Sequence, residues 1–203
     1  MLVPWPKHPF VKHLESRARA LRMRVRLDEH ARLEPSALVA TYDHMVLVHL
    51  HTVAGTAHRA ELTILERESS AWSAIALREG GGPWLITWNP WHTEARTRVS
   101  VLEEVSHIVL EHKPTALVPD PHTGLLRRTY SPSKEREAFG VASAAALPFG
   151  GLVHALGQGR TVEEIADQYG VSTQLVTMRI NTTRARETLV PMQSRGSPPY
   201  LPT

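Results

Sequence analysis

Two glutamates and a histidine share one face of an otherwise apolar stretch, residues 99–112 (VSVLEEVSHIVLEH). In an α-helix, positions i, i+1 and i+4 lie within about a third of a turn, so Glu103, Glu104 and His107 form one polar stripe. Branched aliphatic residues occupy the other faces, which predicts a buried helix. A buried charge without a partner costs several kcal/mol, so the stripe must face a partner, and a metal ion is one candidate.

The spacing of this stripe suits a metal site that activates water. Ligands at i and i+4 place two donors one turn apart on the same helix face, which suits a tetrahedral ion. The residue at i+1 misses the ion but reaches a water bound to it, as in the HExxH pattern of metallopeptidases. Here Glu103 and His107 take the two ligand positions, and Glu104 takes the position of the general base. A carboxylate in place of the first histidine makes the site harder, so we expect zinc, with manganese or iron as alternatives.

A third ligand is expected from the next predicted helix, residues 134–147. A loop rich in proline and glycine, residues 115–128, is long enough to bring that helix alongside the first. The first turn of the second helix holds Glu135 and Glu137. We expect Glu137 to be the third ligand and Glu135 to point elsewhere on the helical wheel.

Simpler interpretations of these residues remain open. Ser100 and Glu103 match a capping box, in which Glu103 would only stabilise a helix N-terminus. Glu103 and His107 could instead form a surface pair worth roughly 0.2–0.5 kcal/mol. The apolar flanks argue against both interpretations. His49 and His51 alternate along an expected strand and could face one metal, although no carboxylate or cysteine nearby completes that set.

The elements that position the stripe are predicted to be helices and a small sheet. Hydrophobic spacing predicts helices over residues 11–24 and 37–42 and a strand over residues 45–50. Residues 72–77 and 84–88, separated by a Gly-Gly-Gly-Pro turn, predict a β-hairpin. Because a two-stranded ribbon alone is marginally stable, we expect a small twisted sheet packed on the central helix, and hence an α+β fold.

Residues 161–179 have the spacing of a helix-turn-helix unit, with Gly170 in the turn and Ser172 as the N-cap of the second helix. If this unit binds DNA, its surface extends over residues 161–186. The candidate DNA contacts are Ser172, Gln174, Arg179 and Arg184. The alternative is a scaffold that packs on the rest of the chain.

Composition narrows the function further. The chain has 203 residues, a formal charge of +3 and a pI near 9.5, which permits an acidic partner without requiring one. It contains no cysteine, which excludes disulfides, thiolate catalysis and cysteine-based zinc sites, and a cytoplasmic location is expected. No uninterrupted apolar segment is long enough to cross a bilayer, so no membrane association is expected.

Several segments, in matching order, resemble the ImmA/IrrE family of bacterial zinc metallopeptidases. Residues 72–74 (WSA) and 86–90 (ITWNP) resemble the family's Ser-Ala hairpin and Asn-Pro turn. Residues 96–112 resemble its arginine-led active-site helix, and residues 135–148 resemble its Glu-x-Glu-Ala helix. The resemblance runs to about Ile180. It departs from the family pattern at the first metal ligand, because this chain has an EExxH variant of the HExxH motif.

This resemblance implies a zincin-like fold, a bound zinc ion and cleavage of a helix-turn-helix transcriptional repressor in a stress-response or mobile-element circuit. By position, it gives Glu104 as the base and His107 and Glu137 as metal ligands. Two further functions stay open. One is a non-catalytic pseudo-peptidase that binds a regulator, and the other is a DNA-binding regulator that acts through residues 161–186.

The expected organisation has four parts. An irregular N-terminal arm covers residues 1–10, and a zincin-like metallopeptidase domain covers residues 11–152. A helix-turn-helix-like helical unit follows over residues 153–190. A tail rich in proline and serine, residues 191–203, is expected to be disordered.

Overall fold

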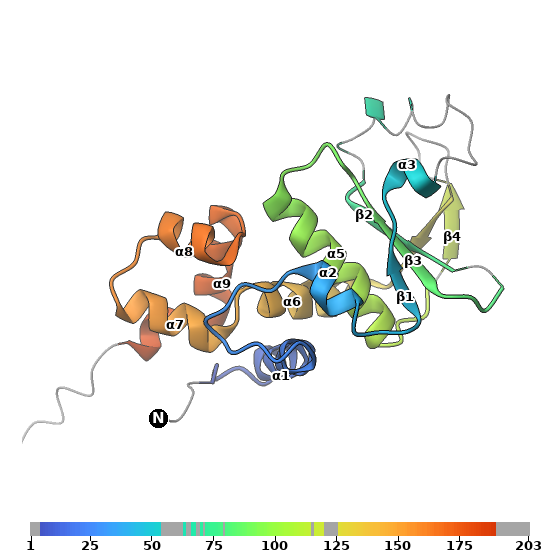
Figure 1. Cartoon of the computed structure of the whole chain (residues 1–203). Coiled ribbons are helices and arrows are strands. Elements are labelled where there is room, and N and C mark those ends of the chain that lie inside the picture. The colour runs from blue at the N-terminus through green and yellow to red at the C-terminus, as the bar shows by residue number, and fades with distance from the viewer. Residues whose placement is uncertain are drawn as a thin grey trace, which may run out of the picture.

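The computed structural model describes residues 5–53, 63, 66–67, 70, 72–78, 80–114, 116–119 and 126–189. The first four residues of the expected arm and the whole expected tail lie outside the described residues. Within the described part, helices and strands are mixed, as the sequence predicts. Figure 1 shows a small sheet at one end, a group of helices at the other, and helix α6 (Pro132–Ala146) between them.

A three-stranded mixed sheet contains the predicted hairpin. Its strands are β1 (Met45–Leu47), β2 (Ala74–Leu77) and β3 (Trp84–Trp88), in the order β1-β3-β2. β3 pairs parallel with β1 and antiparallel with β2, which confirms the hairpin and leaves β2 at an edge. The turn between β2 and β3 contains Gly80 and Gly81 at positive φ, a conformation that glycine adopts without steric penalty.

Two short helices flank β1. They are α2 (Pro35–Val39) and α3 (Leu50–Val53), and both are shorter than the mean helix of a globular protein. Because β1 ends before His49, the prediction that His49 and His51 alternate along one strand is wrong. The His49 ring instead packs edge-on against Trp88, with the ring centroids 5.6 Å apart.

The central helix, α5 (Glu94–Val109), packs against β2, β3 and α6. It begins earlier than predicted, because Thr93 is the N-cap and its hydroxyl accepts a hydrogen bond from the Arg96 backbone N–H at 3.3 Å. Glu103 therefore lies inside the helix rather than in its first turn. The capping-box interpretation of Ser100 and Glu103 is wrong, since the free N–H groups that such a box satisfies lie a whole turn or more upstream.

The segment predicted as a loop, residues 115–128, contains a second sheet. β4 (Ala116–Pro119) and β5 (Leu126–Thr129) pair antiparallel, so the loop prediction is wrong over these strands. Pro119 stands at the end of β4, opposite Leu126. Each strand of a two-stranded sheet has one partner only, so a proline at its end need not interrupt the ladder.

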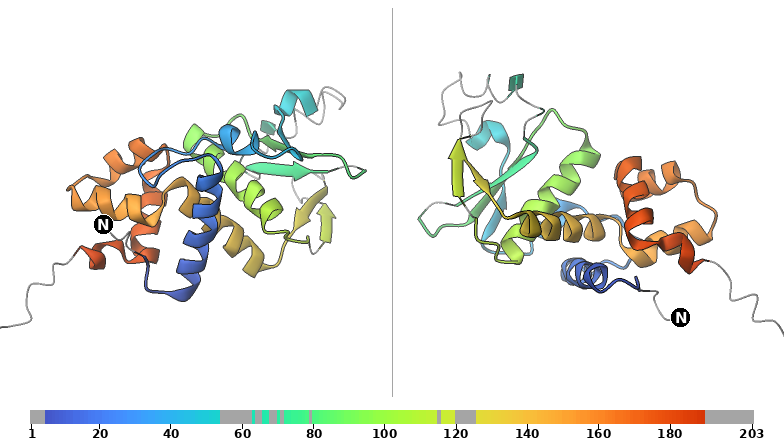
Figure 2. Two further views of the ribbon diagram at one scale, coloured as in Figure 1. Left: turned by 60° about the horizontal axis from the view of Figure 1, so that its bottom comes forward. Right: turned by 180° about the vertical axis from the view of Figure 1, so that it is seen from behind.

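α6 lies between α5 and α1 (Pro9–Arg24), as Figure 2 shows. α1 and α6 each begin two residues earlier than predicted, at a proline that fits the first turn of a helix. The two helices approach closely at Gly140, where an added Cβ would meet Leu14 Cδ1 at 2.6 Å. Among the described residues, no single helix is long and apolar enough to cross a membrane, and α6 meets the criterion only together with the following helix, across a 47° bend.

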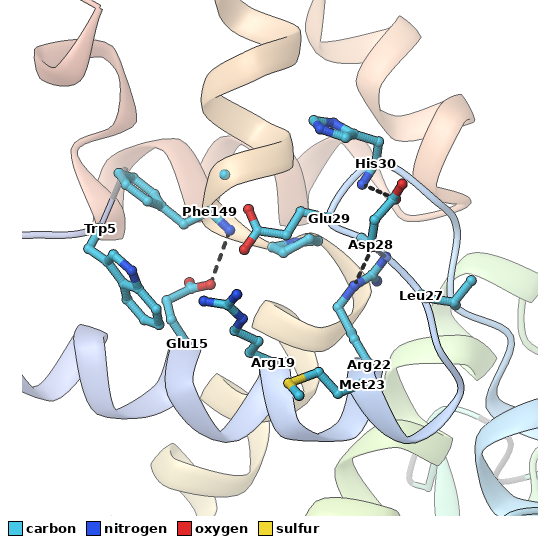
Figure 3. A pocket seen from close by; sticks show the side chains of 12 residues that line it. Trp5, Glu15, Arg19, Arg22, Met23, Leu27, Asp28, Glu29, His30 and Phe149 are labelled. Atoms are coloured by element: carbon cyan, nitrogen blue, oxygen red, sulfur yellow. Dashed lines mark hydrogen bonds between the residues drawn. The ribbon is translucent and has the colours of Figure 1, made fainter. Parts of the chain in front are cut away.

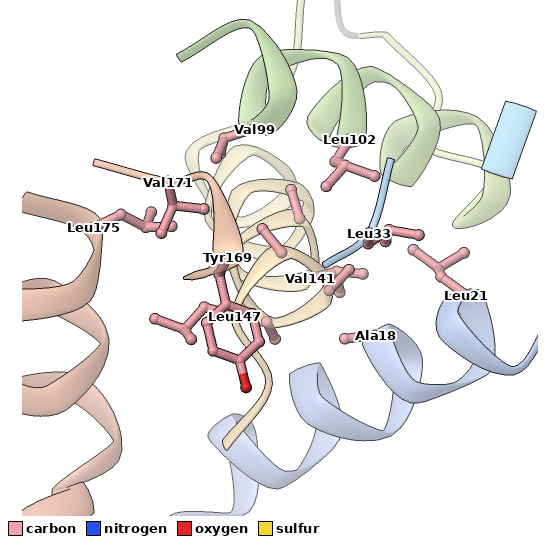
Figure 4. Packing of buried hydrophobic residues seen from close by; sticks show 14 of the residues in the cluster. Ala18, Leu21, Leu33, Val99, Leu102, Val141, Leu147, Tyr169, Val171 and Leu175 are labelled. Atoms are coloured by element: carbon pink, nitrogen blue, oxygen red, sulfur yellow. The ribbon is translucent and has the colours of Figure 1, made fainter. Parts of the chain in front are cut away.

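One continuous hydrophobic core connects the sheet end of the molecule to its helical end. Figure 4 shows side chains from α1, α5, α6 and the C-terminal helices packed together. The predicted domain boundary at residue 152 falls within α7 (Phe149–Gly157), and core residues lie on both sides of it. The labelled members of the cluster include Ala18, Leu21, Leu33, Val99, Leu102, Val141, Leu147, Tyr169, Val171 and Leu175.

The helix-turn-helix unit forms as the sequence predicts. α8 (Val162–Tyr169) ends at Gly170, which adopts the left-handed conformation at φ 62°. α9 (Thr173–Thr183) begins after Ser172, whose hydroxyl accepts a hydrogen bond from the Leu175 backbone N–H. A short 3-10 helix, η2 (Ala185–Thr188), follows and packs against α7 and α9.

Candidate metal centre

α5 and α6 bring together three side chains that can bind a metal. Glu103 and His107 come from α5, and Glu135 comes from the first turn of α6. Their ligand atoms all lie within 4.8 Å of one another, and His107 Nε2 is 3.4 Å from Glu135 Oε2. The His107 side chain is 3% exposed, whereas that of Glu135 is 48% exposed. The cluster is therefore buried on its α5 side and accessible to solvent on its α6 side.

Local sequence explains why each half of the cluster forms. The helical period places Glu103 and His107 on the same face of α5, four residues apart. Pro132 at the first position of α6 fixes where that helix begins, and so places Glu135 in its first turn. Contact between the two helices then brings the halves together.

Glu137, the third ligand that the sequence favours, faces different partners. Its carboxylate lies 2.8 Å from His13 Nε2 of α1 and 3.3 Å from His112 Nε2. Residues two positions apart on a helix lie about 200° apart around its axis, so Glu135 and Glu137 leave α6 in different directions. The expectation that Glu135 points away from the site is wrong. A role for Glu137 as a direct ligand stays a prediction.

The electrostatics of the cluster fit a bound cation. Burial, and then the negative charge of Glu135, raise the pKa of Glu103 to about 7. Burial, and then the charges of His112 and Lys134, lower the pKa of His107 to about 4. Without a cation, the buried carboxylate tends to keep its proton and the imidazole is neutral. Two carboxylates and one neutral imidazole form a donor set that zinc accepts and that also suits manganese or iron.

Glu104, the predicted general base, lies beside this cluster on α5 and contacts the sheet. Its Oε2 accepts a hydrogen bond from the Ala76 backbone N–H of β2 at 3.1 Å. The carboxylate therefore lies between the central helix and the edge strand. It is not a member of the group formed by Glu103, His107 and Glu135.

Comparison with known families decides the identity of this helix-and-sheet unit. The family model Peptidase_M78, described as the IrrE N-terminal-like domain, matches residues 57–181. The chain belongs to this family. Membership confirms the predicted resemblance, implies a zincin-like fold and indicates a metallopeptidase. The matched range includes the three cluster residues and nearly all of the helix-turn-helix unit. No curated protein and no solved structure matches the chain.

The IrrE-family domain surrounds His107 with two residues to which the sequence alone gave no role. His112 Nδ1 lies 3.1 Å from His107 Nδ1, and the Tyr130 ring stacks on His107 with a centroid distance of 3.9 Å. His13, which contacts Glu137, was also missed, because it lies in α1, far away in the sequence. His13 and Tyr130 reach the site only through the packing of separate elements, whereas His112 returns to His107 through a turn at the end of α5.

The predicted DNA contacts do not form one surface. Arg179 is 3% exposed and forms an ion pair with Glu15 of α1, and its Nε donates to the Leu147 carbonyl at 3.1 Å. The prediction that Arg179 reads DNA from an exposed position is therefore wrong. The Ser172 hydroxyl serves as a helix cap. Gln174 and Arg184 are exposed, and Arg184 lies 3.7 Å from Glu187.

A separate cavity lies between α1, the segment that follows it and the start of α7 (Figure 3). Its volume is about 280 Å³, and residues such as Trp5, Arg19 and Phe149 line it. None of its lining residues belongs to the metal cluster. At its wall, the Phe149 backbone N–H donates to Glu15 Oε2 at 3.0 Å. The buried Glu15 of α1 therefore contacts α7 through Phe149 and α9 through Arg179.

Proposed function

We propose that this IrrE-family protein is a metal-dependent endopeptidase whose metal is held by Glu103, His107 and Glu135. The observation that carries the proposal is the convergence of these three ligand groups within 4.8 Å across two helices. Membership in a metallopeptidase family supports it. Zinc is the expected metal, and manganese or iron would suit the two carboxylates as well. A bound metal supplies Lewis acidity, which polarises a carbonyl and makes water more acidic.

Within this site, Glu104 is the proposed general base. It takes a proton from the attacking water and delivers that proton to the leaving amine. Its hydrogen bond from Ala76 N–H supports this role, because the contact holds the carboxylate against the edge strand rather than among the ligands. The burial of His107 supports the same role, because a shielded imidazole keeps its orientation while the exposed α6 side admits substrate.

The proposed substrate is a protein, specifically a helix-turn-helix transcriptional repressor. The family resemblance supports this substrate, and the absence of cysteine supports a cytoplasmic setting. A DNA-binding function is less well supported, because Arg179 holds Glu15 inside the fold rather than facing outward.

Comparison of the wild-type protein with Glu104→Gln tests the proposal. Both proteins, loaded with zinc, are incubated with repressors encoded near the gene, and cleavage products are identified by mass spectrometry. We expect Glu104→Gln to bind zinc as the wild type does and to cleave at least about 100-fold more slowly, which is the usual contribution of a general base.

The same comparison addresses the pseudo-peptidase alternative, which the Glu at the first ligand position favours. Because the pKa of Glu103 is raised to about 7, protons compete with the metal for this carboxylate at low pH. A protein that has lost its metal in this way keeps the fold but does not turn over substrate. If the Glu104→Gln variant regulates its target genes in the cell as the wild type does, catalysis is ruled out and this alternative is supported.

A further inference from the structure

A line of polar contacts runs from α1 to the metal cluster. His13 Nε2 lies 2.8 Å from Glu137 Oε1, and Glu137 Oε2 lies 3.3 Å from His112 Nε2. His112 Nδ1 lies 3.1 Å from His107 Nδ1. His107 then presents its other nitrogen, Nε2, to Glu135 at 3.4 Å. His107 and His112 each use both ring nitrogens in these contacts, and His13 and His112 share the Glu137 carboxylate.

These contacts determine where the protons lie when the histidines are neutral. An ionised carboxylate can only accept hydrogen bonds, so Glu137 requires His112 Nε2 to carry a proton and donate it. The other nitrogen of a neutral His112, Nδ1, must then accept from His107 Nδ1–H. Consequently, His107 Nε2 has no proton, and its lone pair faces a carboxylate oxygen of Glu135. Two acceptors in contact repel each other unless a proton or a metal ion lies between them.

We propose that His112 and Glu137 are positioning residues that fix His107 in the Nδ1–H tautomer and so present its Nε2 to the metal. The inference rests on the proposed metal site and assigns Glu137 a role outside the ligand set. A histidine ligand is often oriented by a hydrogen bond from its second nitrogen, which fixes the tautomer and raises the basicity of the ligand. Here that bond passes through a second histidine before it reaches a carboxylate.

The backbone at the end of α5 explains how His112 reaches this position. Glu111 adopts φ 54°, and the His112 backbone N–H donates to the His107 carbonyl at 3.0 Å. The Glu111 N–H donates to the Ile108 carbonyl at 3.1 Å, which completes a Schellman motif. This motif reverses the chain and returns His112 to the His107 ring. The His112 side chain is 6% exposed, and Tyr130 stacks on His107, so the arrangement is shielded from water.

The tautomer of His107 can be measured directly in the metal-free, full-length protein. We would record long-range ¹H–¹⁵N correlations of protein labelled at histidine, at pH 8, for the wild type, His112→Leu and His112→Gln. The wild type is expected to show His107 protonated at Nδ1. His112→Leu is expected to shift His107 toward the Nε2–H form. His112→Gln is expected to restore the wild-type tautomer, because its amide can donate to Glu137 and accept from His107.

Zinc affinity, measured by competition with a chromophoric chelator, provides the second readout. We expect His112→Leu and Glu137→Gln to lower the affinity by about 10–100-fold, as loss of an outer-shell partner does, and His112→Gln to lower it less. Glu163→Gln is the matched control, because it removes an exposed negative charge on α8, outside these contacts. Circular dichroism confirms that each variant is folded.

The outcomes distinguish this inference from the proposed function. If the wild type binds no zinc, the proposed function fails, and the tautomer in the metal-free protein still decides the inference. Nε2–H in the wild type, or an unchanged tautomer in His112→Leu, would overturn it. So would a loss of zinc binding in Glu137→Gln as large as that in His107→Ala when His112→Leu keeps its affinity, because Glu137 would then be a direct ligand.

Discussion

His107 Nε2 and Glu135 Oε2 lie 3.4 Å apart, on opposite sides of the contact between α5 and α6. This pair joins the two halves of the candidate metal centre. A histidine on a buried helix is common by itself, and so is a glutamate in a first helical turn. Their approach, with Glu103 beside them, brings three possible metal ligands together.

The ligand role of Glu135 predicts a large effect of its replacement. Glu135→Gln keeps the size of the side chain but removes a charged oxygen ligand from the cluster. We expect zinc affinity to fall by more than the 10–100-fold typical of outer-shell partners. Chelator competition measures the change, with Glu163→Gln on the exposed face of α8 as the charge-matched control. An affinity equal to that of the control would show that Glu135 is not a ligand.

The raised pKa of Glu103 predicts that zinc binding releases a proton. Near pH 6, Glu103 is mostly protonated in the metal-free protein, because its pKa is about 7, and it must lose that proton to bind the ion. His107 contributes no proton there, because its pKa is about 4. We expect zinc affinity to rise about tenfold per pH unit from pH 5 to 7 and then to level off.

Calorimetry in buffers of different ionisation enthalpy checks this linkage. The binding heat at pH 6 should depend on the buffer in proportion to the release of about one proton, and this dependence should fade above pH 8. A binding heat at pH 6 that is independent of the buffer would contradict the participation of an ionised Glu103.

The same group predicts a stability cost in the metal-free protein. Folding raises the pKa of Glu103 from 4.5 to about 7, so its contribution to stability is present below pH 4.5 and is lost as the pH rises through 7. Glu103→Gln, which never ionises, should therefore be more stable than the wild type at pH 8 by roughly 1–3 kcal/mol. The two proteins should be equally stable near pH 4. Urea unfolding at both pH values measures this, and a destabilised variant at pH 8 would contradict it.

Arg179 predicts a structural rather than a DNA-binding phenotype. Arg179→Ala leaves Glu15 buried without its cation and should lower the free energy of unfolding by about 3–5 kcal/mol. Arg184→Ala, at a side chain that is 75% exposed, should change it by less than about 0.5 kcal/mol. Denaturant titrations compare the two variants. Equal stabilities, together with weaker DNA binding by Arg179→Ala alone, would restore the DNA-reading interpretation.

Local sequence was sufficient to predict several parts of this protein. Helical periodicity placed Glu103 and His107 on one face of α5, and the family pattern along the chain identified the domain. The β2–β3 hairpin was also predictable from the glycines of its turn, and the helix-turn-helix unit from Gly170 and Ser172, which cap its two helices through nearby backbone groups. Interactions of this kind depend on residues a few positions apart, which the sequence displays directly.

Tertiary structure decided the rest. The choice between Glu135 and Glu137 depends on the rotation of α6 about its axis against α5 and α1, which no spacing within α6 specifies. His112 reaches His107 through a local Schellman motif, which the sequence hid because its left-handed residue is Glu111 rather than the glycine that would have signalled the turn. The sequence by itself therefore determined which chemical groups are available. Packing between elements distant in the chain determined which of them meet, because helix rotation and docking are set by the whole core.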